Sequence, residues 1–296
     1  MRRFSLLCTL FLTLASLTAH AQEKRSTSAA SYLKRANARY AKVDIQGAIA
    51  DFDIAITFDP LLAKAYNNRA VAREKRGDFD GAIHDYGRAI EINPRFTEGY
   101  ANRARARLAL RDYDGAMADC DSAILLRPRF AQVYNTRGSV RFETGDLAGA
   151  IADYSSAIAI DPHLAEPYSN RGAVRRARGD LDGAIEDYDR SLLIEPRSPN
   201  TYNNRGNAWR EKGQLERAIA DFDRAISLDP GLAMAYAGRG LIRLLQERPI
   251  EADRDFSACI KLDPGLRSFV QERITEVKRQ RSLRSSEPLV HSREHN

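Results

Sequence analysis

Proline recurs at a constant interval along most of this sequence, at Pro60, Pro94, Pro128, Pro162, Pro196, Pro230 and Pro264. Alanine recurs on the same period from Ala48 to Ala252, and aspartate from Asp51 to Asp255. A fixed period of this size is the signature of supersecondary units that stack into a solenoid. The period therefore constrains the fold more than the chain length, which alone suggests about two domains.

Each unit contains two helical patterns with turn signals between them. Ala82 and Tyr86 lie one helical turn apart and share a face. Before them, Gly77 can adopt the left-handed conformation that ends a helix, and Asp78 can cap the next one. The residue before Pro94 is disfavoured in helical geometry, so the second helix should stop there. The pattern predicts an antiparallel helix pair in every unit.

The repeats and their flanks divide the chain into segments. They are a signal peptide at 1–21, a disordered lead-in at 22–28, seven repeats at 29–62, 63–96, 97–130, 131–164, 165–198, 199–232 and 233–266, a capping helix at 267–280 and a disordered tail at 281–296. The cap is expected because the last unit of a solenoid exposes an apolar face. In the seventh repeat the sequence Glu247-Arg248-Pro249 replaces the Gly-Asp that stands at residues 77–78 and 179–180, so we expect a remodelled turn there.

The N-terminal sequence predicts a secretory signal peptide. Arg2 and Arg3 precede an apolar run over residues 4–17, and Ala19-His20-Ala21 forms an A-x-A cleavage site. The alternative, an uncleaved anchor, is disfavoured because about 14 apolar residues are short for a ~20-residue span. We therefore expect a periplasmic or secreted protein that starts at Gln22 and has no transmembrane segment after cleavage.

Composition excludes several classes of function. The formal net charge is +6, from 46 basic and 40 acidic residues, which is too mild to indicate nucleic acid as a partner. Three cysteines are too few for a disulfide framework. The sequence contains no G-x-S-x-G, H-E-x-x-H, C-x-x-C or glycine-rich phosphate loop. We expect no enzyme activity, no cofactor and no metal site.

The repeated letters resemble those of tetratricopeptide repeat proteins of a secreted bacterial type. Y-N-N-R occurs at residues 66–69 and 202–205, and G-D-x-D-G-A-I at 77–83 and 179–185. The resemblance covers residues 29–266 and implies an all-α, right-handed superhelical solenoid of antiparallel helix pairs, with seven repeats and a C-terminal capping helix. It also implies that the first helices line a concave groove. The sequence departs from the family in having arginine where Leu and Tyr are usual, as at Arg69 and Arg73.

One arginine row should be partly buried and therefore needs acidic partners. The acid that recurs as regularly is an aspartate, and for Arg69 the candidates are Asp85 of the same repeat and Asp51 of the preceding one. The sequence leaves this choice open. We predict structural ion pairs among Arg69, Asp85, Arg103, Asp119, Arg137, Asp153, Arg171, Asp187, Arg205 and Asp221. The alternative is an arginine row that binds an anionic ligand.

Two asparagine rows mark the candidate binding surface. One row contains Asn68, Asn102, Asn170 and Asn204, and beside it lie Asn67, Asn135 and Asn203. By resemblance they are similar to the asparagine ladder in the repeats of the O-linked N-acetylglucosamine transferase, which holds the backbone of an extended peptide. A carboxamide suits this task because it both donates and accepts hydrogen bonds. The alternative is that these amides bond to neighbouring helices or water.

The resemblance implies further groove positions, namely Arg105, Ser139, Phe142, Ala173, Arg176, Asn207 and Arg210, with Glu143 and Glu211 near the rim. Arginines outnumber acids there, which favours an acidic peptide or a C-terminal carboxylate. The carboxylate clamp of the chaperone-binding members is not matched, because Leu33 stands where its first lysine would fall.

Taken together, these features predict a non-catalytic scaffold that binds a protein or extended peptide in its groove. The alternative function is a structural subunit that assembles with itself, or with an envelope complex, through the repeat edges. The identity of the partner and the oligomeric state stay open.

Overall fold

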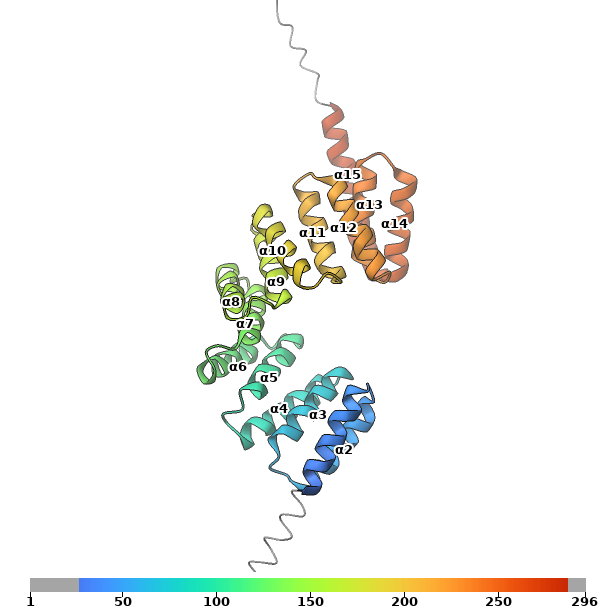
Figure 1. Ribbon diagram of the computed structural model, residues 1–296. Helices are drawn as coiled ribbons and strands as arrows, with labels where there is room; N and C mark the ends of the chain where they lie inside the picture. The colour runs from blue at the N-terminus through green and yellow to red at the C-terminus, as the bar shows by residue number, and fades with distance from the viewer. Residues whose placement is uncertain (1–26, 287–296) are drawn as a thin grey trace, which may run out of the picture. The chain divides into compact units, whose positions relative to one another are not determined.

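The computed structural model describes residues 27–286, and all the regular structure in that range is helical (Figure 1). The signal peptide and most of the lead-in lie outside the described residues. The chain divides into two compact units, residues 1–146 and 147–296, and each is described by itself.

The N-terminal unit starts with a helix over residues 27–41. It continues with α2 (Ile45–Phe58), α3 (Ala63–Lys75), α4 (Phe79–Ile92), α5 (Thr97–Ala109), α6 (Tyr113–Leu126) and α7 (Ala131–Glu143). The C-terminal unit contains α8 (Leu147–Ile160), α9 (Ala165–Ala177), α10 (Leu181–Ile194), α11 (Pro199–Glu211), α12 (Leu215–Leu228), α13 (Ala233–Leu245), α14 (Pro249–Leu262), the 3₁₀ turn η1 (Pro264–Leu266) and α15 (Arg267–Ser286).

Successive helices form antiparallel pairs, such as α3 with α4, α5 with α6, and α9 with α10. The odd-numbered helices from α3 to α13 are the first helices of these pairs, and neighbouring first helices contact one another along each unit. This arrangement confirms the predicted all-α solenoid of antiparallel helix pairs (Figure 1).

The tight turn inside each pair has one left-handed residue. Gly77 has φ +81°, and the Oδ1 atom of Asp78 then accepts a hydrogen bond from the backbone N–H of Gly81 at 3.0 Å. Glycine is suited to this position because it has no Cβ. Val43, Arg111 and Glu247 occupy the same position with φ of 65°, 61° and 61°, so those turns adopt the conformation at a cost.

The expected remodelling of the turn in the seventh repeat was wrong. The backbone N–H of Arg248 donates to the carbonyl of Arg243 at 2.9 Å, as that of Asp78 does to Arg73 at 3.0 Å. Glu247 tolerates the left-handed conformation, and Pro249 begins α14, where a helix needs no N–H. The backbone of the turn is therefore kept, and only the side-chain cap is lost.

The core contains many alanines and one larger side chain in each pair. Ala82, Ala116, Ala184 and Ala218 are completely buried, so the two helix backbones approach closely. The larger side chains are Phe52, Tyr86, Tyr154, Tyr188, Phe222 and Phe256, and the smaller Cys120 takes this position in α6. Packing is tight around them, because a Cβ added to Gly172 would lie 2.9 Å from the ring of Tyr188.

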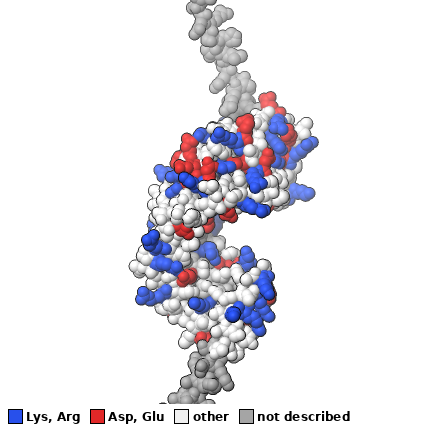
Figure 2. Space-filling view, in the orientation of Figure 1, with Lys and Arg blue, Asp and Glu red and all other residues white. Residues whose placement is uncertain are grey.

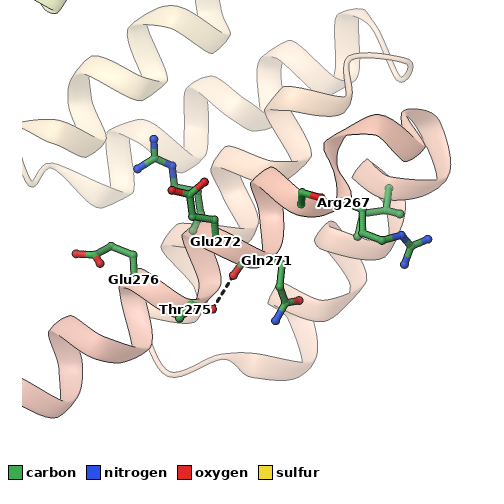
Figure 3. Close-up of a pocket in the computed structure, with 8 residues that line it drawn as sticks. Arg267, Gln271, Glu272, Thr275 and Glu276 are labelled. Atoms are coloured by element: carbon green, nitrogen blue, oxygen red, sulfur yellow. Dashed lines mark hydrogen bonds between the residues drawn. The ribbon is translucent and has the colours of Figure 1, made fainter.

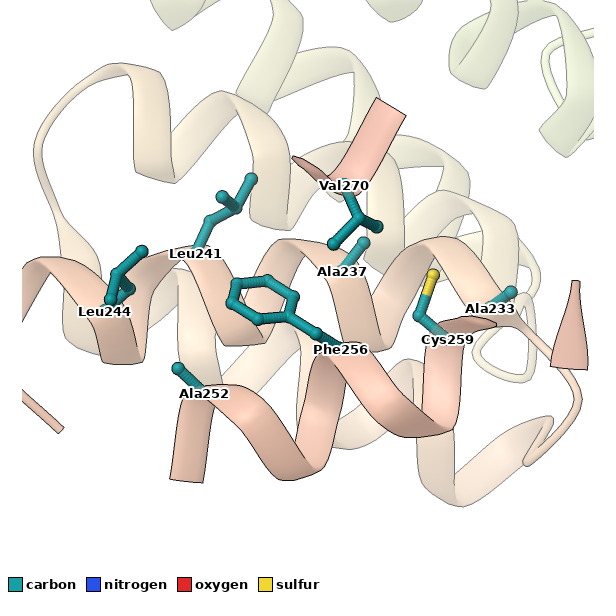
Figure 4. Close-up of a cluster of buried hydrophobic side chains, with 8 residues drawn as sticks. All are labelled: Ala233, Ala237, Leu241, Leu244, Ala252, Phe256, Cys259 and Val270. Carbon is teal, nitrogen blue, oxygen red and sulfur yellow. The ribbon is translucent and has the colours of Figure 1, made fainter. Parts of the chain in front are cut away.

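The last helix, α15, covers the open end of the C-terminal unit. Its Val270 is buried against α13 and α14, among Leu241, Phe256 and Cys259 (Figure 4). Burial raises the pKa of the Cys259 thiol, and within the described residues neither Cys259 nor Cys120 forms a disulfide. α15 runs to Ser286, past the predicted end of the cap at residue 280, and the rest of the predicted tail lies outside the described residues.

The left-handed turns give a direct test. Arg111→Gly should raise the free energy of unfolding by about 0.5–1 kcal/mol, because the relief of ~1–2 kcal/mol of backbone strain exceeds the entropy that glycine adds to the unfolded chain. Chemical denaturation measures this change, and Arg111→Ala is the control because it removes the same side chain but keeps the strain. Equal stability of the two variants would contradict the prediction.

Candidate functional site

The recurring arginine binds the recurring aspartate of its own pair. Arg69 donates from Nε and Nη2 to the two carboxylate oxygens of Asp85 at 2.7 and 2.6 Å, in a bidentate pair. Asp85 is 0% exposed and the Arg69 side chain 14%. The same geometry occurs in Arg35–Asp51, Arg103–Asp119, Arg171–Asp187, Arg205–Asp221 and Arg239–Asp255. The structure therefore chooses between the two positions that the sequence left open.

The predicted pair of Arg137 and Asp153 is divided between the two units, so it stays a prediction. Within the N-terminal unit, Arg137 donates from Nη1 to Asp121 at 2.7 Å.

In several repeats a third guanidinium nitrogen connects the arginine to the preceding pair. Arg69 donates from Nη1 to Asp53 of α2 at 2.5 Å, and Arg205 and Arg239 do the same to the equivalent acids Asp189 and Asp223 at 2.5 Å. In Arg171 the acceptor is the hydroxyl of Ser155 at 2.9 Å. Each of these guanidinium groups therefore links two adjacent helix pairs. The acceptor in the preceding pair is Asp53 or its equivalent, and not the recurring aspartate.

A second arginine of the first helix holds the same buried carboxylate. Arg73 lies 2.8 Å from Asp85 and donates to the carbonyl of Gly81 at 3.1 Å. Burial alone would lower the pKa of Arg69, but the hydrogen bonds and charge of Asp85 outweigh it and raise the pKa. The sequence showed Arg73 only as a departure from the family, although its constant spacing to the recurring aspartate was the signal that could have revealed the contact.

The asparagines of the N-terminal unit bond to one another across three first helices. The buried Asn67 donates to Asn68 at 3.1 Å and accepts from Asn102 at 3.0 Å. Asn68 in turn donates to Asn37 at 2.9 Å, a residue that sequence reasoning missed. These amides form a continuous row, in which Asn68 and Asn102 are half-buried.

The C-terminal unit has a shorter row on α11. Asn203 lies beside Asn204, with a long hydrogen bond of 3.5 Å between the two amides. Asn207 donates to the carbonyl of Asn203 at 2.9 Å. The side-chain oxygen of Asn203 is buried and has no hydrogen-bond partner within the part of the chain described. Of the other predicted members, Asn135 is buried in α7 and Asn170 is half-buried in α9.

Other predicted groove residues of the N-terminal unit form hydrogen bonds within that unit. Arg105 donates to Glu74 at 2.8 Å, and Glu74 also accepts from the hydroxyl of Tyr86 at 2.7 Å. The Ser139 hydroxyl donates to the carbonyl of Asn135 at 3.1 Å, and Glu143 accepts from the Tyr113 hydroxyl at 3.4 Å. Phe142 is half-buried, as is Ala173 of the C-terminal unit.

A cavity of about 410 Å³ lies on the first-helix face of the C-terminal unit. Arg176, Asn207, Arg210 and Glu211 line it from α9 and α11; the first three were predicted groove residues, and Glu211 was predicted to lie near the rim. Arg176 donates to Glu211 at 2.6 Å, and Arg210 donates to Asn207 at 3.3 Å. The structure thus brings together residues of successive repeats that are far apart in the sequence.

A larger hollow of about 920 Å³ lies along α15 (Figure 3). Gln271, Glu272 and Thr275 line it and are exposed, and Thr275 donates its hydroxyl proton to the carbonyl of Gln271 at 2.8 Å. Basic and acidic side chains are interspersed over the visible face of this unit (Figure 2). The smaller cavity is the better candidate because two of its charged side chains, those of Arg176 and Arg210, are partly buried.

Two further features of the described residues bear on function. Within residues 27–286 no group of three or more His, Cys, Asp or Glu side chains is placed to hold a metal ion. The helices described there are all too short or too polar to cross a membrane.

Comparisons with known proteins agree with this geometry. A tetratricopeptide repeat model matches residues 63–96 and 199–232, and a second model, described as TPR repeat, matches 138–175 and 172–209. The chain therefore contains tetratricopeptide repeats. Such repeats generally serve as non-catalytic scaffolds that bind proteins or peptides. Curated protein sequences gave no significant match.

Solved structures share the fold. A tetratricopeptide repeat protein from Parabacteroides merdae aligns with a TM-score of 0.66 at 18% identity, over 85% of this chain and 99% of that chain. Pseudomonas aeruginosa pilF aligns with a TM-score of 0.63 at 18% identity, over 74% and 97%. A chain of the APC/C hetero-tetramer Cut9-Hcn1 aligns with a TM-score of 0.70 at 16% identity, over 76% and 44%. At these sequence identities the comparison shows a shared fold and no shared function.

The two acids that contact Arg69 provide a matched test of the ion-pair row. Asp85→Ala should cost about 3–5 kcal/mol, because it leaves a largely buried guanidinium without its main partner. Asp53→Ala should cost about 0–1 kcal/mol, because Asp53 is 52% exposed.

Hydrogen exchange should locate the damage in residues 63–96 and the adjacent pairs, since each repeat contacts only its neighbours. Unchanged exchange there in Asp85→Ala would show that the arginine is not held by this pair, and would support the anionic-ligand alternative.

Proposed function

We propose that this protein is a non-catalytic scaffold of the periplasm that binds an extended protein segment or peptide across its first helices. The observation that carries the proposal is the row of amides on these helices, Asn37, Asn68, Asn67 and Asn102, which crosses three adjacent helix pairs. A row of groups that both donate and accept, spaced along a solenoid, suits the regularly spaced N–H and C=O groups of an extended backbone.

The amides differ in what they can offer a ligand. Asn67 is buried and joins its neighbours, so it serves to position the row. Asn68 and Asn102 are half-buried, so part of each amide faces solvent and can bond to a peptide. In the C-terminal unit the side-chain oxygen of Asn203 is an acceptor without a partner among the described residues, which a peptide N–H could fill.

The location and the absence of catalysis are parts of the proposal that rest on the sequence. Residues 1–21 have the layout of a cleavable secretory signal, and the repeats between 29 and 266 contain none of the catalytic motifs sought. A scaffold with such a leader would meet its partner in the cell envelope.

The amide row can be tested by binding. In a variant with Asn37, Asn68 and Asn102 all changed to alanine, each lost amide should weaken binding of an envelope partner by about 0.5–1.5 kcal/mol. Affinity capture from envelope extract identifies the partner, and titration with that purified partner measures the loss. Asn200→Ala is the control, because Asn200 is an exposed asparagine at the start of α11.

Two outcomes would contradict partner binding by the amide row of the first helices. Normal partner binding by the folded triple variant would exclude the amide row and direct attention to the repeat edges. Concentration-dependent self-association in light scattering, with no loss on mutation, would instead support a structural subunit.

Export is a separate prediction. A fusion of residues 1–30 to a reporter should reach the periplasm, and N-terminal sequencing of the exported protein should begin at Gln22. The A-x-A sequence before that residue is the reason for this cleavage point. Unprocessed reporter in the cytosol would contradict the prediction, and a fusion that starts at Gln22 is the control.

A further inference from the structure

The cavity of the C-terminal unit collects more positive charge than its own acids balance. The guanidinium groups of Arg176, Arg210 and Arg273 line it together with a single carboxylate, that of Glu211. Arg176 donates to Glu211 at 2.6 Å, whereas the nearest nitrogen of Arg210 is 3.9 Å from it. The described lining of the cavity therefore carries a net excess of positive charge.

Arg273 reaches this cavity because the repeat pattern is incomplete after α14. It follows Arg239 by one repeat period, but the two positions that supply acids to the other arginines are Ser257 and Leu289. Its guanidinium instead lies over the ring of Phe269, 5.4 Å from the ring centre. The capping helix thus brings to the cavity an arginine for which the pattern supplies no aspartate.

Two buried donors of the cavity lining and the hydroxyl of a neighbouring tyrosine lack a hydrogen-bond partner among the described residues. They are the Nε atoms of Arg176 and Arg210 and the hydroxyl of Tyr188, which lies beside Arg176. Burial raises the pKa of Tyr188 to about 12, so this hydroxyl keeps its proton. The cavity lining therefore has more donors than its two acceptor side chains, Asn207 and Glu211, satisfy.

The N-terminal unit shows what satisfies the equivalent hydroxyl. There Tyr86 donates to Glu74 at 2.7 Å, and Glu74 occupies the repeat position that Arg176 occupies further along the chain. An arginine cannot accept this hydrogen bond. The exchange of Glu for Arg therefore removes an acceptor and adds a positive charge at the same position.

These charges are costly without an anion. Burial lowers the pKa of Arg210; Glu211 opposes the shift, and the nearby positive Arg176 and Arg273 add to it. A carboxylate is planar and accepts two parallel hydrogen bonds from a guanidinium group, which makes these bonds about twice as strong as neutral ones. An anion in the cavity would offset the repulsion and accept from the free donors.

We propose that this cavity binds a carboxylate of the peptide ligand, either its C-terminal carboxylate or an Asp or Glu side chain. Arg176 and Arg210 donate to it, and Arg273 approaches from the capping helix. Leu241 and Phe269 give the lining an apolar part for the carbon atoms next to the carboxylate. The inference rests on the proposed peptide-binding function, to which it adds the chemistry recognised at the C-terminal end of the repeats.

Three small probes test the site by calorimetry at low salt with the mature full-length chain. N-acetyl-L-leucine carries a terminal carboxylate, N-acetyl-L-glutamic acid with an amidated α-carboxyl carries a side-chain carboxylate, and N-acetyl-L-leucinamide carries neither. At least one acid should bind saturably and the amide should not. The tighter acid identifies the source of the carboxylate.

Arg210→Gln should weaken binding of that acid about tenfold or more, as expected for loss of a charged hydrogen-bond donor. Added salt should weaken binding to the wild type more than to the variant. Arg178→Gln is the matched control, because Arg178 is an exposed arginine at the end of α9, and it should leave binding unchanged. If Arg210→Gln does not fold, Arg273→Gln on the capping helix must still weaken binding.

Two results would overturn the proposal. One is equal binding of N-acetyl-L-leucine and its amide, and the other is unchanged acid binding in both folded arginine variants. Failure of all three probes while the asparagine variant still loses its partner would overturn the carboxylate site and leave the peptide-binding function intact. Acid binding that depends on Arg210, with normal partner binding by the asparagine variant, would support the carboxylate site and contradict peptide binding by the amide row.

Discussion

A buried carboxylate held by arginine is the interaction on which the repeats of this protein depend. Asp85 has no exposed surface, and an isolated charge at such a place would be prohibitively costly. Arg69 and Arg73 both bind it, and Arg69 also reaches Asp53 of the preceding pair. The guanidinium group of Arg69, which neutralises the buried carboxylate of its own pair, thus also joins that pair to the one before it. This double use accounts for arginine where the family usually has leucine and tyrosine.

The same constraint separates structural from functional charge. An arginine that has an aspartate at the spacing of Arg69 and Asp85 belongs to the scaffold, because its guanidinium is used within the pair. Arg176 and Arg210 stand outside this pattern, and they converge on a cavity where Glu211 is the acid among the described lining residues. Arg273 belongs to the pattern by its period, yet the positions of its two acids hold serine and leucine. The departures from the repeat therefore indicate where a ligand could supply the missing charge.

Sequence reasoning predicted the helix pairs well and the contacts of the candidate surface less well. Gly77, Asp78 and Pro94 each act locally, so their effects on turn and helix ends could be read directly. The turn at Glu247 was misjudged because a non-glycine residue adopts the left-handed conformation there, as Val43 and Arg111 do in two other turns. The hydrogen bond from Asn102 to Asn67 joins side chains of different repeats, and periodicity cannot show which side chains of adjacent helices meet.

The sequence by itself determined the unit of this protein, because helix propensity, capping and the small residues at close contacts all repeat on one fixed period. It also indicated that an arginine and an aspartate would pair in nearly every unit, since neither could be buried alone. Only the tertiary structure decided which aspartate each arginine binds and that one guanidinium serves two pairs. It also decided that three arginines from three helices share a cavity. These outcomes depend on how neighbouring helices pack. The distance between two packed helices is set by the volume of the side chains between them and not by spacing along the chain.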